Sequence, residues 1–324
     1  MPLRHQARLD APVDAVRAAV VDVLGASATA AGNRVEGTVE SAARGPMTVV
    51  VTLETDGAGT RLTVTGEDPP HVPWFQWFSG PALRHATKRV LRWVVDAIEA
   101  HRTGAPPPEQ PRPNRLAPPV PFDERQTRSV ATACAIALVT GTGASLFGTN
   151  IDFIGDSFDA SDQALGIAGA VTRVGVVIGL VLTAMADRRG RRLLLIVSVA
   201  GVSLSSLVSA VAPNLELFTA AQTVNRGLFN TAFIVAAIVV VEEAPEGARA
   251  YAVAMLALAR GAGAGISTLI HPLADLGPEA WRAAFALHAA SILLIPAFAR
   301  TLPETVRYTA LAARVVPTKL GRVR

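Results

Sequence analysis

The sequence predicts an all-α membrane bundle of six transmembrane helices, preceded by a small soluble α+β domain. Half of the 324 residues are apolar, 17% are charged and the mean hydropathy is +0.37, whereas a soluble protein carries about 25% charged residues. The charges concentrate in the first 128 residues, and residues 129–299 consist of long apolar runs with few breaks. Each run has the roughly 20 residues that a helix needs to cross about 30 Å of hydrocarbon.

Residues 1–102 are predicted to form the soluble α+β domain. From the spacing of apolar residues we expect, in chain order, a strand over 4–10, a helix over 11–24, strands over 47–55 and 60–66, and a helix over 80–100. A D-G-A-G turn between the two later strands predicts a hairpin. The closing helix is amphipathic, because its apolar residues lie on one face, opposite Arg84, Lys88, Arg92 and Asp96.

The opening ARLDAPVDAVRAAVVDVL and the long closing helix resemble the helix-grip domains of the START and polyketide-cyclase (SRPBCC) type. That resemblance implies a curved sheet wrapped around the long helix, with a cavity for an apolar ligand. From the residues alone, a small α+β domain without a ligand is the alternative.

A proline-rich linker is predicted over 103–128, because 104–121 holds eight prolines and no periodic pattern. The N-terminus has no apolar stretch of the kind that a secretory signal needs, so we expect the first domain to stay in the cytoplasm. A basic cytoplasmic tail is expected over 301–324.

The transmembrane domain is predicted over 129–300. Its six spans are expected near 129–149, 165–186, 193–211, 217–241, 251–273 and 283–299. With the N-terminus inside, the inner loops and the tail hold eleven lysines and arginines, and the outer loops hold only Arg282. Lysine and arginine accumulate on the cytoplasmic side, so we expect a multi-pass protein of the cell membrane with both termini in the cytoplasm.

The loop between the second and third spans reads T-A-M-A-D-R-R-G-R-R-L-L-L. It resembles the major facilitator superfamily signature G-x-L-A-D-R-x-G-R-R, with matches at Ala186, Asp187, Arg188, Gly190, Arg191 and Arg192. Thr183 and Met185 depart from that pattern. An arginine in the fourth span, Trp281-Arg282 and the P-E-x-x-R-Y segment ending at Tyr308 agree with the same family.

The resemblance implies that this loop forms a cytoplasmic charge lock that opens and closes as two halves of a transporter rock. Asp187 and Arg191 match the acid and the base of that lock. Glu242 and Glu243 end the fourth span on the same side of the membrane. We therefore expect Arg191 to pair with Glu242 or Glu243.

Three arginines, Arg173, Arg226 and Arg260, are predicted to lie near the membrane midplane, about 12 to 14 Å from the nearer surface at a rise of about 1.5 Å per residue. An arginine at that depth costs at least about 2.5 kcal/mol unless it faces a cavity or a partner. Asp152 is the nearest acid expected. An excess of cations favours an anionic solute, and a purely structural role for the three arginines is the alternative.

Several other classes of function have no support in the residues. No paired catalytic carboxylates, metal-ligand cluster or nucleophile motif is present, so we expect no enzyme, no cofactor and no metal. No basic and aromatic stripe supports a nucleic-acid partner. The R-G-A-G-A-G segment, 260–265, is interpreted as close helix packing through small residues rather than as a phosphate loop.

The leading hypothesis is a secondary transporter of the major facilitator type that moves a small solute by alternating access. The family is built from two six-helix halves, so we expect a half or truncated transporter. Its partners would be the lipid bilayer, the solute, and a second six-helix half from the same or another chain. The alternative is a membrane-tethered protein that binds an apolar ligand and does not transport.

Overall fold

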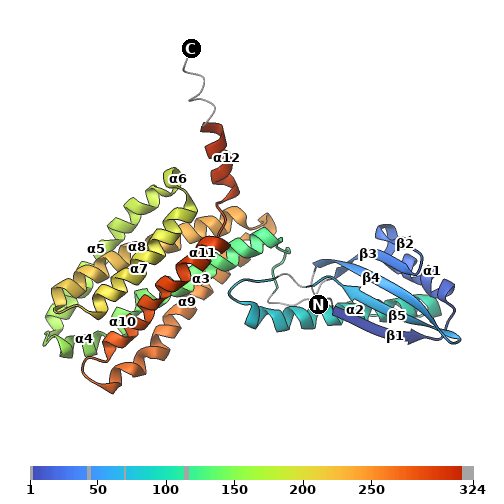
Figure 1. Ribbon diagram of the computed structural model, residues 1–324, viewed down its shortest axis with the longest axis horizontal. Helices are drawn as coiled ribbons and strands as arrows, with labels where there is room; N and C mark the ends of the chain where they lie inside the picture. The colour runs from blue at the N-terminus through green and yellow to red at the C-terminus, as the bar shows by residue number, and fades with distance from the viewer. Residues whose placement is uncertain (1–2, 42–44, 69–70, 113–116, 316–324) are drawn as a thin grey trace, which may run out of the picture. The chain divides into compact units, whose positions relative to one another are not determined.

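The computed structural model describes residues 3–41, 45–68, 71–112 and 117–315, apart from the side chains of residue 187 and of 311–315. The chain divides into two compact units, Met1–Glu124 and Arg125–Arg324. The fold class predicted from the sequence is confirmed, because a small sheet domain precedes six apolar helices (Figure 1).

The first unit is an antiparallel sheet that packs against helices. Its elements are β1 (Leu3–Leu9), α1 (Val13–Leu24), the 3-10 turn η1 (Gly25–Ser27), β2 (Thr29–Ala31), β3 (Arg34–Ser41), β4 (Gly45–Asp56), β5 (Gly59–Gly66) and α2 (Gln76–Thr103). The strand order is β1-β5-β4-β3-β2. β4 and β5 form the expected hairpin, with Asp56 opposite Gly59, whereas β2 and β3 were not predicted.

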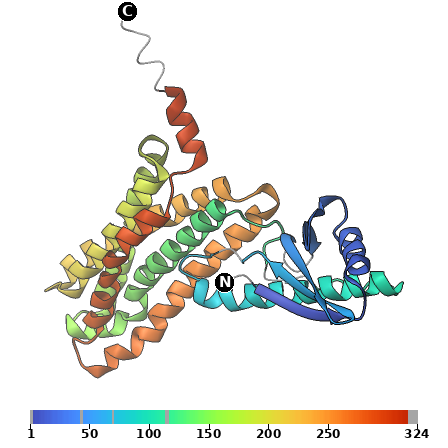
Figure 2. The same ribbon diagram turned by 45° about the vertical axis from the view of Figure 1, so that its right-hand side comes forward.

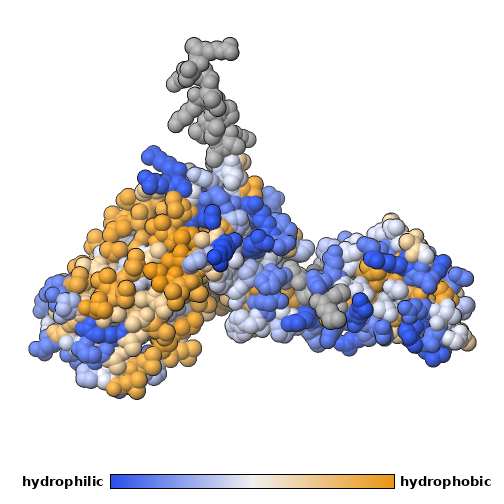
Figure 3. Space-filling model, viewed as in Figure 1, coloured by the Kyte–Doolittle hydropathy of each residue, from blue (hydrophilic) through white to orange (hydrophobic). Residues whose placement is uncertain are grey.

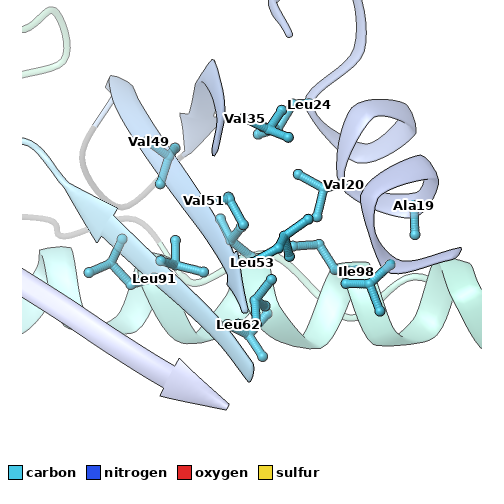
Figure 4. Close-up of a cluster of buried hydrophobic side chains, with 14 of the residues drawn as sticks. Ala19, Val20, Leu24, Val35, Val49, Val51, Leu53, Leu62, Leu91 and Ile98 are labelled. Carbon is cyan, nitrogen blue, oxygen red and sulfur yellow. The ribbon is translucent and has the colours of Figure 1, made fainter. Parts of the chain in front are cut away.

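Successive side chains of β4 and β5 point to opposite faces of the sheet, so one set of aliphatic side chains faces the helices. Val49, Val51 and Leu53 of β4 and Leu62 of β5 are fully buried, and they meet Leu91 and Ile98 of α2 (Figure 4). Burying an aliphatic side chain of this size contributes about 1.5–3 kcal/mol. The space between the sheet and α2 is thus filled by the domain's own side chains, and the likeness to ligand-binding helix-grip domains stays a prediction.

The long helix α2 begins earlier than the sequence predicted. It starts at Gln76 instead of residue 80 and contains Pro81. Because proline disrupts the interior of a helix, its presence argued against a helix that begins before it. At its other end Gly104 adopts a left-handed conformation and its N–H caps the helix. The Trp93 indole N–H then donates to the Pro108 carbonyl, so the start of the linker packs back on α2.

Six segments of the second unit are long and apolar enough to cross a membrane. They are α3 (Glu124–Thr149), α5 (Asp162–Ala184), α7 (Arg191–Ala210), α8 (Leu215–Glu243), Glu246–Leu276 and Trp281–Thr301. The fifth comprises η2 (Glu246–Ala248), α9 (Arg249–Ile270) and η3 (His271–Leu276), and the sixth α10 (Trp281–Ala289), η4 (Ala290–Leu294) and α11 (Ile295–Thr301). Shorter helices are α4 (Ile151–Ser157), α6 (Ala186–Arg189) and α12 (Val306–Val315).

Two helix crossings in the bundle depend on glycine. A Cβ added to Gly175 of α5 would lie 2.1 Å from the Thr223 carbonyl oxygen of α8. A Cβ added to Gly263 of α9 would lie 2.1 Å from the Leu138 carbonyl oxygen of α3. Small residues let transmembrane helices approach to backbone contact. The expected packing of the R-G-A-G-A-G segment therefore occurs at Gly263, the middle glycine.

The surface of the bundle is apolar where a lipid-facing surface is expected. Figure 3 shows a broad hydrophobic face on this unit, and α5 alone exposes Ile167, Val174 and Val177 at 58–62%. A soluble protein rarely exposes so large a contiguous apolar area. The second unit is therefore a multi-pass membrane domain.

Candidate functional sites in the membrane bundle

The turn between α5 and α7 is held by a glycine and a glutamate. Gly190 has φ +93°, a conformation that side chains other than glycine rarely adopt. The Glu304 carboxylate, from the segment between α11 and α12, accepts hydrogen bonds from the backbone N–H groups of Arg191 (3.0 Å) and Arg192 (3.3 Å). A carboxylate at the first turn of α7 also meets the positive end of the helix dipole.

Arg191 of that turn forms a buried ion pair with the end of α8. Its Nη2 atom lies 3.2 Å from Oε1 of Glu242, and the two side chains are 4% and 8% exposed. The guanidinium also lies over the Tyr308 ring, 5.6 Å from its centroid. Removing one member of a buried pair leaves an unpaired buried charge and costs about 3–5 kcal/mol. The contact therefore ties α7 firmly to α8.

Glu243, the second acid expected as a partner of Arg191, pairs elsewhere. Its carboxylate lies 3.1 Å from Nε of Arg125 at the start of α3 and accepts from the Val306 N–H at 3.0 Å. Arg125 in turn donates to the Glu304 carbonyl oxygen at 2.8 Å. We call Arg125, Arg191, Glu242, Glu243 and Glu304 the charged cluster.

The other members of the predicted gating motif lie around this cluster. The side chain of Asp187 falls outside the described residues. Arg188 is exposed at the end of α6, and Arg192 donates to the Ala299 carbonyl oxygen. Both Figure 1 and Figure 2 place α6 and the start of α12 at the same end of the bundle. The predicted motif, the end of α8 and the P-E-x-x-R-Y segment thus meet at that end.

Neither Arg125 nor the role of Glu304 was predicted from the sequence. Arg125 falls within the predicted linker, whereas α3 already begins at Glu124. A basic residue just before an apolar run was the available signal. Glu304 lay within the quoted P-E-x-x-R-Y segment, but only the fold brings it to Gly190.

A small polar hollow lies between α3, α5 and α8. It has a volume of about 30 Å³ and is lined by Ala144, Phe147, Thr172, Gln222, Asn225 and Arg226. Nε of Arg226 is buried and has no hydrogen-bond partner among the described residues. Hydroxyl, amide and guanidinium groups facing one hollow can hold a polar or anionic solute.

The predicted midplane residues do not all gather at this hollow. Arg226 lines it, and its guanidinium lies 5.9 Å from the centre of the Phe229 ring. Arg260 approaches the same ring to 4.9 Å from α9. Arg173 is exposed on α5, and Asp152 is exposed on α4. The structure thus brings Arg226 and Arg260 to one aromatic ring and leaves Arg173 and Asp152 away from it.

A hydrogen-bonded chain next to the hollow was not predicted. Nε2 of His288, in α10, lies 2.9 Å from the Val139 carbonyl oxygen. Nδ1 of the same ring lies 2.9 Å from Ser206 Oγ. Because a carbonyl can only accept, Nε2 carries a proton and donates to Val139. Asn225 Nδ2 donates to the same Ser206 Oγ at 3.5 Å. This chain links α3, α7, α8 and α10.

At the opposite end of the bundle, Arg282 holds the end of α7. Its Nη1 donates to the carbonyls of Ala210 (3.1 Å) and Ala212 (2.7 Å), and its guanidinium lies 4.6 Å from the centre of the Trp281 ring. Hydrogen bonds from Arg282 and Ser157 lower the pKa of Glu279 below its ordinary value. Glu279 thus remains a carboxylate that anchors Arg282.

The family model of the Major Facilitator Superfamily matches residues 133–322. No curated protein matched the sequence.

The structure resembles solved transporters. The proton:xylose symporter XylE bound to 6-bromo-6-deoxy-D-glucose is 19% identical, with a TM-score of 0.52 over 57% of this chain and 46% of that one. The inward open xylose transporter XylE from E. coli is 18% identical, with a TM-score of 0.50 over 60% and 52% of the two chains. This chain therefore spans about half the length of these structures, and the likeness at such identity concerns the fold.

The family match covers more than half of the chain, and it includes the D-R-x-G-R-R turn whose arginine pairs with Glu242. The six apolar helices and their arrangement agree with it. The chain belongs to the major facilitator superfamily, with a six-helix membrane domain that follows a small α+β domain.

Proposed function

We propose that this chain is the N-terminal half of a secondary transporter that moves a small anionic solute across the cell membrane by alternating access. Arg226, with a buried Nε that makes no hydrogen bond among the described residues, is the observation that carries the proposal. Arg226 is half-buried, and a guanidinium at membrane depth is costly without a partner. A carboxylate or phosphate group of the solute would supply that partner.

The hollow favours a site completed by a second bundle. Its volume of about 30 Å³ is far below the roughly 300 Å³ of a small-ligand pocket. Gly169 of α5 and Gly265 of α9 have open space where a Cβ would lie, and Arg173 and Arg260 are exposed on the same two helices. Small residues and arginines at membrane depth suit a protein-lined cavity better than lipid. The second bundle would come from a continuation of the same chain, from another copy or from a separate chain.

We assign the charged cluster to the cytoplasmic end, where it would act as the latch of the rocking motion. Lysine and arginine are concentrated at that end in the sequence, as expected for cytoplasmic loops. The Arg191 to Glu242 pair is buried and joins two helices through side chains. Both termini would then lie in the cytoplasm.

Uptake by the purified chain in liposomes tests the transport proposal. The assay compares radiolabelled small carboxylates, inorganic phosphate and a neutral pentose, with the chain alone and with its second half where one is found. We expect anion uptake that R226Q lowers at least tenfold, because a charge-assisted contact is worth about 1.5–3 kcal/mol. R249Q, which removes an exposed arginine, is the matched control. Uptake of the pentose alone, or anion uptake unchanged by R226Q, would overturn the anionic assignment.

Charge exchange tests the latch. R191E and E242R should each raise hydrogen exchange at the cytoplasmic ends of α7 and α8, because each places like charges in a buried contact. The double variant R191E/E242R should restore protection. If both single variants leave exchange and uptake unchanged, the pair is not a latch.

A further inference from the structure

We propose that the first half of α2 docks the soluble domain on an anionic lipid surface. Trp77 and Phe78 are 77% and 68% exposed, and their rings lie 5.9 Å apart in an edge-on arrangement. Among the described residues of this unit, the next most exposed large apolar side chain is Val120, at 36%. Two adjacent aromatic rings in water cost free energy unless another surface covers them.

Basic residues continue from the aromatic pair along the same face of α2. Arg84, Lys88 and Arg92 are exposed and follow Trp77 at intervals of seven, four and four residues, which places them on one side of a helix. Among the described residues, no carboxylate forms an ion pair with any of these three. The opposite side of α2 is fixed, because Val90, Leu91, Val94 and Ile98 are fully buried against the sheet.

Aromatic side chains followed by cations on one face of a helix match the chemistry of a bilayer surface. Tryptophan and phenylalanine enter the region between headgroups and acyl chains, while lysine and arginine contact anionic headgroups. Each cation near such a surface strengthens binding by about 1 kcal/mol, or about fivefold.

The chain itself keeps the domain close to lipid. Residues 104–123 are all that separates α2 from α3, the first membrane span, and an extended proline-rich linker adds about 3.1 Å per residue. The domain therefore stays within about 60 Å of the bilayer, and tethering at this range converts weak surface contacts into a populated docked state. The anionic cytoplasmic leaflet is the lipid source if the proposed topology holds.

The test uses the full chain in nanodiscs, with a bimane fluorophore on A82C in a C134A background. Ala82 is exposed one turn from Phe78, and Cys134 is the single cysteine of the chain. The quencher is a lipid with a nitroxide near the headgroup. We expect stronger quenching when about a third of the phosphatidylcholine is replaced by phosphatidylglycerol. We also expect the domain to leave the lipid surface as the salt concentration rises from about 0.1 M to about 1 M, where the Debye length falls to about 3 Å.

Two variants separate the aromatic and the basic contributions. W77S/F78S should abolish quenching, and R84S/K88S/R92S should lower the docking equilibrium constant about a hundredfold, at about fivefold per cation. R4S/R8S/R34S removes three exposed cations from β1 and β3 and is the matched control, expected to dock normally. Circular dichroism verifies that each variant keeps its fold.

Equal quenching in neutral and anionic nanodiscs, or quenching that survives both variants, would overturn the proposal. A fluorophore that is shielded from solvent but is not quenched by the nitroxide lipid would also overturn the proposal. That result would indicate a protein partner instead. The experiment requires no transport and exposes both nanodisc faces to the same lipid. Its outcome is therefore separate from that of the proposed transport function.

Discussion

Adjacent acids at the end of α8 have different partners because successive helix positions point about 100° apart. Glu242 faces α7 and forms an ion pair with Arg191, whereas Glu243 faces α3 and forms an ion pair with Arg125. Glu304 adds a third acid, which binds backbone N–H groups instead of a guanidinium. The charged cluster therefore joins α3, α7, α8 and the segment after α11 through several contacts, each to a separate acceptor.

Gly190 is the backbone position on which this cluster most depends. We expect G190A to destabilise the bundle by about 1–3 kcal/mol, because the residue would be held at φ +93°. Its Cβ would also lie 2.5 Å from Oε2 of Glu304. Thermal unfolding in detergent measures the effect.

The control for this substitution is G261A in α9, where nothing lies within 4 Å of an added Cβ. Alanine favours a helix by up to about 1 kcal/mol over glycine, so G261A should leave stability equal or slightly raised. An unfolding temperature of G190A equal to that of the natural chain would contradict the strained-turn interpretation.

At the scale of elements, the bundle is organised by glycine crossings that join α5 to α8 and α3 to α9. We expect G175A to separate α5 from α8 and to cost about 1–3 kcal/mol, because overpacking forces backbone shifts. G169A on the same helix adds its methyl group to open space and should be tolerated. Comparing the unfolding temperatures of the two variants in detergent tests this difference.

If G175A and G169A are equally stable, α5 can shift without cost and the crossing is not a fixed contact. The corresponding comparison in α9 uses G263A and G265A. Only Gly263 lies against backbone atoms of α3, so G263A should be the destabilising member.

The last two spans differ from the first four because they are interrupted. α9 continues into η3 and α10 into η4, and Pro272 and Pro296 lie at the starts of η3 and α11. Proline lacks the N–H that continues the helical ladder. Hydropathy is insensitive to such breaks, so the apolar runs alone predict two continuous spans there.

At the scale of the whole molecule, each unit has its own core, and we expect two unfolding transitions in calorimetry. L62A, at a fully buried site in β5, should lower the free energy of unfolding of the soluble unit by about 2–5 kcal/mol. The temperature of that unit's transition should fall accordingly. I136A, at a fully buried site in α3, should lower the other transition. A single transition that both variants shift would show instead that the units unfold together.

Local pattern was sufficient for much of this protein. The six spans, the β4–β5 hairpin, both long helices of the soluble unit and the D-R-x-G-R-R turn follow from hydropathy, period and spacing, which are properties of neighbouring residues. β2 was missed because it has only three residues, all exposed, and a short strand on the edge of a sheet carries little apolar signal. β3 was missed because glycine and serine hold two of its four buried positions, Gly37 and Ser41, which leaves only Val35 and Val39 as apolar signal.

The sequence by itself determined that this chain has a soluble part and a six-span membrane part, because transfer of a segment into lipid depends on the sum of its own side chains. Only the tertiary structure decided that Arg191 takes Glu242, that Arg125 takes Glu243, and that Arg226 lines a hollow with Gln222 and Asn225. Such pairings depend on how each helix is rotated about its axis and on how closely glycines let helices approach, and both are set by packing between segments far apart in the chain.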